Sequence, residues 1–114
     1  MEYDVLVCDE PTPETGRVYK VGEVRAAVEK AQAMVAKRTL FVVPSSPDGS
    51  IDLNSVKGVA TRLWLDGSVL KAEVAWLHPV PDSTKVRLAC IGNVDWNNDR
   101  QVVTNLEITG LLFT

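Results

Sequence analysis

The sequence has 114 residues, of which 46% are hydrophobic and 24% charged, and its formal net charge is −3. This length and composition suit a single soluble domain over residues 1–114 and exclude intrinsic disorder. The absence of a lysine- and arginine-rich cluster argues against a nucleic-acid partner, and no apolar run is long enough to span a membrane.

The amino-terminal third predicts a strand, a loop and one helix. Val5–Cys8 is a short apolar run, and the loop Asp9–Arg17 is broken by prolines and a glycine. Hydrophobic residues recur at spacings of four, three and four from Val24 to Val35, which predicts an amphipathic helix over about Val21–Lys37. This helix has no good capping residue at its start.

The middle of the chain predicts a second strand and a hairpin. Leu40–Val43 reads as a buried strand, and Pro44–Ser50 has the composition of a turn. Val59–Leu65 and Ser68–Trp76 each alternate between two faces and flank Asp66-Gly67, a pair favoured in type I′ turns. The sequence therefore predicts a two-stranded antiparallel unit here.

The last third predicts two more strands around a long polar turn. Val86–Ile91 is the first strand, Gly92–Asp99 is the turn, and about Gln101–Phe113 is the closing strand. Its inward-facing residues are expected to be Val102, Leu106, Ile108 and Leu112. We expect an α+β, β-rich fold, with about six mostly antiparallel strands in a partial barrel and one packed amphipathic helix.

Four segments share their order and spacing with one family of viral proteins. They are Thr15–Tyr19, Ile51–Val59, the hairpin Leu63–Val74 and Asn105–Leu111. The first resembles the N-G-R-[IV]-Y segment, the second the I-x-L-x-x-V-S-H-V segment and the last the F-E-L-x-x-I-D strand of the tailed-phage prohead maturation proteases. These proteases are relatives of the herpesvirus assemblin. The resemblance spans about residues 15–113 and implies their fold.

The catalytic positions of that family are filled differently here. The place of its G-E-L-x-H-P segment is taken by Phe41–Pro47, with Ser46 where the histidine belongs, and Gly58 replaces a second histidine. The place of its S-S-R-G-x-G segment is Arg87–Gly92, which contains no serine. Because a serine hydroxyl is nearly inert without a general base, we expect no catalytic residues and a protein that is not an enzyme.

Other reactive groups offer weak alternatives. His78 is the only histidine, and Pro79 and Pro81 favour an extended path that separates it from Ser83. Cys90 lies in an apolar strand, where burial disfavours a thiolate. The sequence leaves open whether it pairs with Cys8.

No metal or cofactor site is expected. The cysteines lack the spacing of a zinc site. Asp95–Asp99 lacks the glycine and the distal glutamate of a calcium loop, and no nucleotide-binding motif is present.

The resemblance implies a role in the phage head. We expect a structural protein such as a capsid decoration or head-assembly protein, homo-oligomeric, bound to the major capsid protein or other head proteins. It would be found in the virion and, during assembly, in the host cytoplasm. The alternatives are an active prohead serine endopeptidase and a small module that binds a host protein. The expected partner contacts are Trp96, Asn97, Asn98, Pro44, Ser45 and Ser46, because tryptophans favour interface hot spots.

Overall fold

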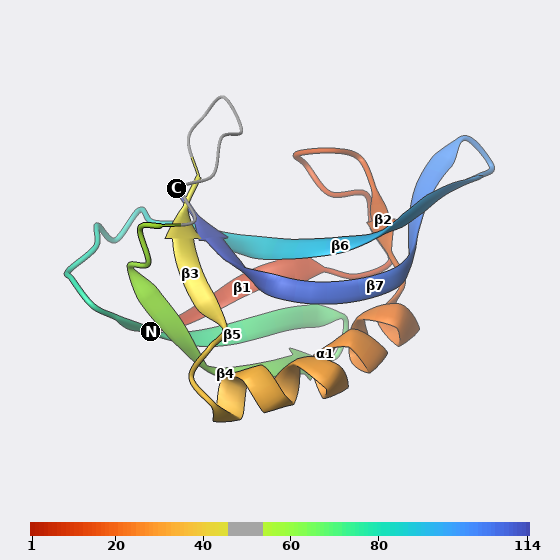
Figure 1. The fold of residues 1–114 in the computed structure, drawn as a ribbon. Helices are drawn as coiled ribbons and strands as arrows, with labels where there is room; N and C mark the ends of the chain where they lie inside the picture. Colours follow the sequence, from red (N-terminus) through yellow and green to blue (C-terminus); the bar gives the residue numbers. More distant parts are fainter. Residues whose placement is uncertain (46–53) are drawn as a thin grey trace.

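The computed structural model describes residues 1–45 and 54–114, and within them the chain forms seven strands and one helix (Figure 1). In chain order these are β1 (Glu2–Val7), β2 (Val18–Tyr19), α1 (Val21–Ala36), β3 (Phe41–Pro44), β4 (Gly58–Asp66), β5 (Val69–Trp76), β6 (Val86–Asn97) and β7 (Arg100–Phe113). The two-residue strand β2 was not predicted, because two residues are too few to show alternation.

All seven strands belong to one strongly curved sheet (Figure 1). Their order is β1-β5-β4-β3-β7-β2, and β6 pairs with β7 along the length of that strand. The pairs β2–β7 and β3–β7 are parallel, and the other pairs are antiparallel. The predicted β-rich α+β fold, a partial barrel with one packed helix, is confirmed.

Helix α1 lies across the concave side of the sheet against β4 and β7. Its buried stripe is the predicted one and consists of Val24, Ala27, Val28, Ala31 and Val35. Lys20 at the N-cap makes no side-chain cap bond, but Val21 N donates a hydrogen bond to Asp9 Oδ1 at 3.1 Å. The helix ends in a Schellman motif, in which Thr39 N donates to Met34 O at 2.9 Å and Arg38 has a φ of 59°.

The β4–β5 hairpin is present, but its turn lies one residue later than predicted. Asp66 pairs with Val69, so the turn residues are Gly67 and Ser68. Of these only Gly67 has a positive φ, 62°. A glycine with positive φ at the first turn position is the pattern of a type II′ turn, not of the type I′ turn predicted.

The predicted polar turn over Gly92–Asp99 is wrong, because β6 continues to Asn97. The turn consists only of Asn98 and Asp99, with φ of 51° and 62°. Two successive residues with positive φ make a type I′ turn, which asparagine and aspartate tolerate better than other non-glycine residues.

The predicted inner face of β7 is also partly wrong. Asn105, with a φ of 52°, sits in a bulge that shifts the pairing of β7 with β6. Val103 is therefore buried at 4% exposure, in place of Val102, while Leu106 and Ile108 face inward as predicted. A second shift between Ile108 and Gly110 places Leu111 in the core, where Leu112 was predicted, although Leu112 is also buried.

Candidate functional site

The end of β3 meets the start of β6 through a polar contact between Ser45 and Arg87. Nη2 of Arg87 donates a hydrogen bond to Oγ of Ser45 at 2.7 Å, and Ser45 is only 7% exposed. Nε of Arg87 is buried and has no hydrogen-bond partner within residues 1–45 and 54–114. Leaving a buried donor unpaired is costly, so this nitrogen is a polar weak point in the packing of the fold.

Sequence reasoning missed the role of Arg87, although the family resemblance pointed to its segment. The structure brings together the two segments in which the resemblance places a catalytic histidine and serine. The available signal was a single charged residue inside the apolar strand Val86–Ile91. Charged residues are rarely buried without a partner, so Arg87 was the residue to single out.

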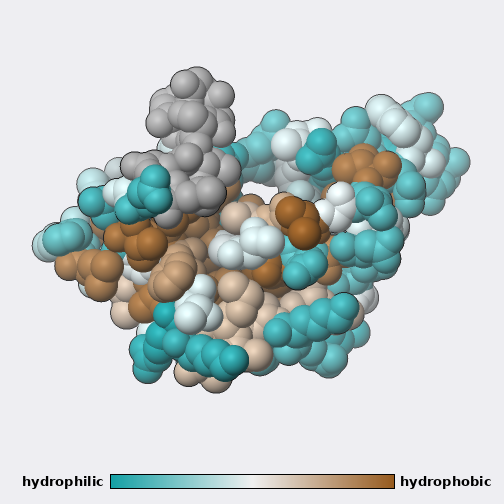
Figure 2. All heavy atoms as spheres, viewed as in Figure 1, coloured by the Kyte–Doolittle hydropathy of each residue, from teal (hydrophilic) through white to brown (hydrophobic). Residues whose placement is uncertain are grey.

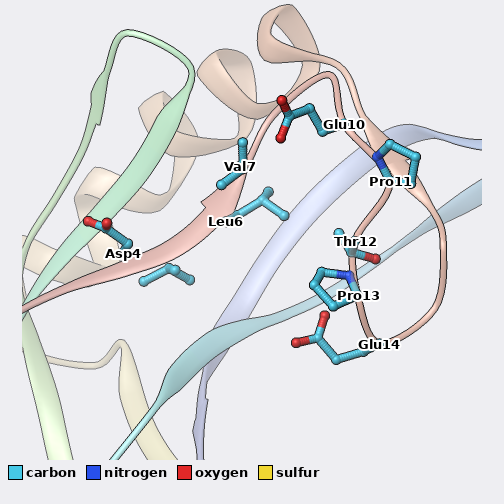
Figure 3. A pocket seen from close by; sticks show the side chains of 9 residues that line it. Asp4, Leu6, Val7, Glu10, Pro11, Thr12, Pro13 and Glu14 are labelled. Carbon is cyan, nitrogen blue, oxygen red and sulfur yellow. The ribbon is translucent and has the colours of Figure 1, made fainter.

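Three hollows lie side by side, the second of them lined by Arg87, and we refer to them together as the cross-barrel groove. The first, about 240 Å³, lies between β1 and the loop that follows it (Figure 3). The second, about 440 Å³, shares Val5, Leu6, Thr12 and Glu14 with the first and is also lined by Arg87. The third, about 550 Å³, shares Arg17, Tyr19, Leu88 and Leu112 with the second.

The groove changes character from one end to the other. The first hollow is surrounded by the carboxylates of Asp4, Glu10 and Glu14 (Figure 3). Arg17 and Arg87 line the second, and the third is walled mainly by apolar side chains of β3, β6 and β7. Such a mixture of apolar walls and a few polar groups is typical of a binding site.

Cys90 lies in the third hollow with its thiol against the hydroxyl of Tyr19. Burial raises the pKa of Cys90, although the Tyr19 hydroxyl and the Arg17 guanidinium oppose that shift. Burial, and then Cys90 itself, also raises the pKa of Tyr19. Both groups are therefore protonated at neutral pH, and the thiol is not an activated nucleophile. Cys8 and Cys90 are free thiols and are not paired with each other.

Neither His78 nor Arg87 acts as a general base for Ser45 or Cys90 in the described part of the chain. His78 is exposed in the segment between β5 and β6 and has no hydrogen bond to a serine or to Cys90 within residues 1–45 and 54–114. A guanidinium has no acceptor site, so Arg87 cannot take the proton of Ser45.

The structure separates the predicted partner contacts into two places. Trp96 is 70% exposed, and Asn97 and Asn98 are exposed beside it at the tip of the β6–β7 hairpin. Pro44 is half-buried, and Ser45 is buried beside Arg87, outside the lining of the groove. Ser46 lies outside the described residues. A contact role for these residues stays a prediction.

Residues 1–45 and 54–114 offer neither a metal site nor a membrane-spanning helix. They hold no group of three or more histidine, cysteine or acidic side chains arranged to bind a metal ion. Among the same residues, no helix has the length and apolar character needed to cross a bilayer.

Comparisons with known proteins give a structural relative but no sequence relative. No family model matches the sequence, and no curated protein matches it. The structure is similar to the capsid assembly protease gp21 of bacteriophage T4, with a TM-score of 0.78. The match covers 100% of this chain and 81% of the protease chain at 13% sequence identity.

This likeness corrects the expectation that the protein is not an enzyme. That expectation treated the altered histidine and serine positions as decisive, whereas the whole chain matches a protease. A protease scaffold can draw its nucleophile and base from different places in the chain, so altered motifs do not exclude catalysis. The chain thus has the fold of the T4 capsid assembly protease, as its resemblance to the prohead proteases implied.

Proposed function

We propose that the protein acts in the assembly of a bacteriophage head, where it binds an extended segment of a head protein in the cross-barrel groove. The observation that carries this proposal is the likeness in fold, over the full chain, to a capsid assembly protease. Because fold alone does not fix function, the groove supplies the second part of the argument.

The groove has the chemistry to hold a polypeptide main chain. Arg87 lines the second hollow, and its guanidinium has N–H donors beyond the one bonded to Ser45, to which a main-chain carbonyl of a bound segment would bond. The neighbouring hollow of about 550 Å³, with Phe41, Val43 and Leu111 in its lining, has room for an apolar side chain. The fitting partner is therefore a segment of the major capsid protein or of a scaffold protein that carries an apolar residue.

Binding is tested with fluorescent peptides tiled across the head proteins of the encoding phage. We expect at least one peptide to bind, and Arg87→Met to weaken it by about tenfold, which corresponds to one charge-assisted hydrogen bond. Arg62→Met is the matched control, because Arg62 lies over the ring of Trp64 at 4.3 Å, outside the groove lining. If no peptide binds, or if both variants bind alike, the groove is not the binding site.

A head-protein endopeptidase is the second candidate, and the protease fold favours it. His78 would be its base, since it is the only histidine of the chain. The same peptides are followed by mass spectrometry for cleavage. Products that disappear in His78→Ala but persist in Ser83→Ala would establish this activity. Intact peptides with both wild type and variants would reject it.

Association with the particle is a separate expectation of the first proposal. A protein that acts on assembling heads should co-purify with proheads or virions in many copies. Quantitative mass spectrometry of purified particles, with lysate as reference, checks this. Its presence in the lysate but not in particles of any stage would contradict a head-bound role.

A further inference from the structure

The outer half of the β6–β7 hairpin projects from the barrel as an arm, defined here as Ile91–Arg100 (Figure 1). All residues of this arm are exposed. Three of them are large and apolar: Ile91 at 58%, Val94 at 37% and Trp96 at 70% exposure. Figure 2 shows apolar atoms on this projection among hydrophilic ones. Because these three apolar side chains are exposed, packing of the barrel core does not account for their presence.

The free edge of β6 in this arm has little protection against pairing beyond the bulge between Ile91 and Asn93. Among the described strands β6 pairs only with β7, so one row of its main-chain groups is open. Edge strands in natural proteins are normally guarded by lysines, prolines or a covering element. Residues 91–97 read Ile-Gly-Asn-Val-Asp-Trp-Asn, with no lysine, no proline and one charge. This edge is therefore suited to accept another strand.

We propose that the arm pairs with the arm of a second copy of the chain, with the two strands antiparallel and the two-fold axis at Val94. In this register Val94 faces Val94 of the second copy. Gly92 then faces Trp96 of the second copy, and Asn93 faces Asp95 of the second copy. The pairing uses all seven residues 91–97 and joins two sheets into one.

Three alternative registers are less favourable. An axis at Asp95 places two like charges opposite each other, which destabilises a strand pair. An axis at Asn93 places Asp95 against apolar Ile91, and an axis at Trp96 leaves only three strand residues paired before the turn. Only the axis at Val94 combines full overlap with a polar amide, that of Asn93, opposite Asp95.

In the proposed register, Gly92 lies opposite Trp96 of the second copy. It has no side chain, and a Cβ there would lie 3.0 Å from Thr104 O and 3.2 Å from Val103 Cγ1. Glycine is therefore required by the close approach of β7, whose atoms occupy the side of Gly92 to which a Cβ would point. An aromatic residue opposite an edge glycine is a recognised stabilising pair in sheets.

A second copy is the partner that this strand itself specifies. The seven residues complement their own reverse order, so the same surface serves on both sides of a two-fold axis. Such an isologous contact closes as a dimer and leaves no edge for further growth. Pairing with a strand of another protein would not require Gly92, Asn93 and Asp95 to stand at positions that complement their own reverse order.

The first experiment changes the charge at one position in opposite directions. Sedimentation from about 5 to about 500 µM should show a monomer–dimer equilibrium, as expected for a small interface. Asn93→Lys, which faces Asp95 of the second copy, should tighten the dimer about fivefold, and Asn93→Asp should weaken it about fivefold, because two symmetry-related pairs change. The double variant Asn93→Asp/Asp95→Asn should restore wild-type affinity.

The second experiment locates the axis. Val94→Cys, in a Cys90→Ser background, should form a disulfide-linked dimer on mild oxidation, because directly opposed residues are close enough for a disulfide. Ser68→Cys in the same background is the control, since Ser68 is equally exposed at the β4–β5 turn. Trp96→Ala should weaken the dimer about thirtyfold, as expected for a hot-spot residue.

The outcomes separate this proposal from the groove function. A monomer at all concentrations would overturn the pairing. The pairing would also be overturned if Asn93→Lys and Asn93→Asp changed the dimer affinity equally. It would be overturned as well if the arm bound a head protein and not a second copy of the chain. Arg87→Met should dimerise as wild type, while Trp96→Ala should bind groove peptides as wild type, so each proposal can fail without the other.

Discussion

The two halves of the β6–β7 hairpin share one pairing ladder but have different surroundings. In the barrel half, Leu111 is fully buried and pairs with Leu88, while β3 flanks β7 on its other side. In the arm, Trp96 pairs with Gln101 and is 70% exposed. The same backbone geometry thus serves the stability of the fold at one end and is free for recognition at the other.

The largest expected effect is in the barrel half. Leu111→Ala should lower the free energy of unfolding by about 2–5 kcal/mol, because it leaves a cavity in a closely packed core. Urea denaturation followed by tryptophan fluorescence measures this. Leu111→Met, which nearly conserves volume, should cost less than about 1.5 kcal/mol. An alanine variant as stable as wild type would show that the barrel half is not the core of the domain.

The second largest effect is expected at alkaline pH, which should lower the stability of the barrel. Burial raises the pKa of Cys8 and Cys90 above the ordinary value of 9.0 and that of Tyr19 above 10.0. The folded chain therefore holds these protons more tightly than the unfolded chain. Their contribution to stability is complete below the unfolded pKa and is lost as the pH rises through the folded pKa.

We therefore expect the urea midpoint to fall above about pH 9. The fall should be smaller in Cys90→Ala, which removes one of the three groups, and unchanged in the arm variant Trp96→Ala. A midpoint that is constant from neutral to strongly alkaline pH would contradict the burial of these groups.

Replacing Asp99 with glycine should stabilise the fold, because glycine adopts the positive φ of this turn position at lower cost. Asp99 has a φ of 62°, and Asp99→Gly creates the Asn-Gly pair preferred in type I′ turns. We expect a gain of about 0.5 kcal/mol in the free energy of unfolding. Asp66→Gly is the control, because Asp66 lies in a strand without positive φ and should lose stability on the same change.

The smallest effect on stability is expected for Trp96→Ala. Because its side chain is mostly exposed, the free energy of unfolding at low protein concentration should change by less than about 0.5 kcal/mol. Chemical denaturation at about 1 µM, where a weak dimer is dissociated, measures this. A loss comparable to that of Leu111→Ala would mean that the arm is part of the core.

Elements with a strong period were predictable from the sequence. The stripe from Val24 to Val35 fixed the helix, and the alternation on both sides of Asp66 fixed the hairpin. The prediction failed for the arm, because Gly92, Asn93 and Asp95 are residues that usually form turns. Their strand conformation comes from pairing with β7, a tertiary effect that overrides local preference.

The candidate site was less predictable than the fold. Ser45 and Arg87 are 42 residues apart in the sequence. They meet because β3 and β6 both pair with β7, which brings Nη2 of Arg87 to 2.7 Å from Oγ of Ser45. The resemblance marked both segments but drew attention to the missing histidine and serine. It gave no sign that Arg87 bonds to Ser45, because side-chain contacts across strands do not follow from spacing.

Strand β7 is the hub of the sheet, since β2, β3 and β6 all form ladders with it. During synthesis these three strands leave the ribosome before β7 does. Until β7 emerges, β2 and β6 have no partner among the described strands, and β4 is the one described strand that β3 can join. The barrel therefore assembles late, and a stalled or prematurely terminated chain would expose unpaired edges to proteases and to aggregation.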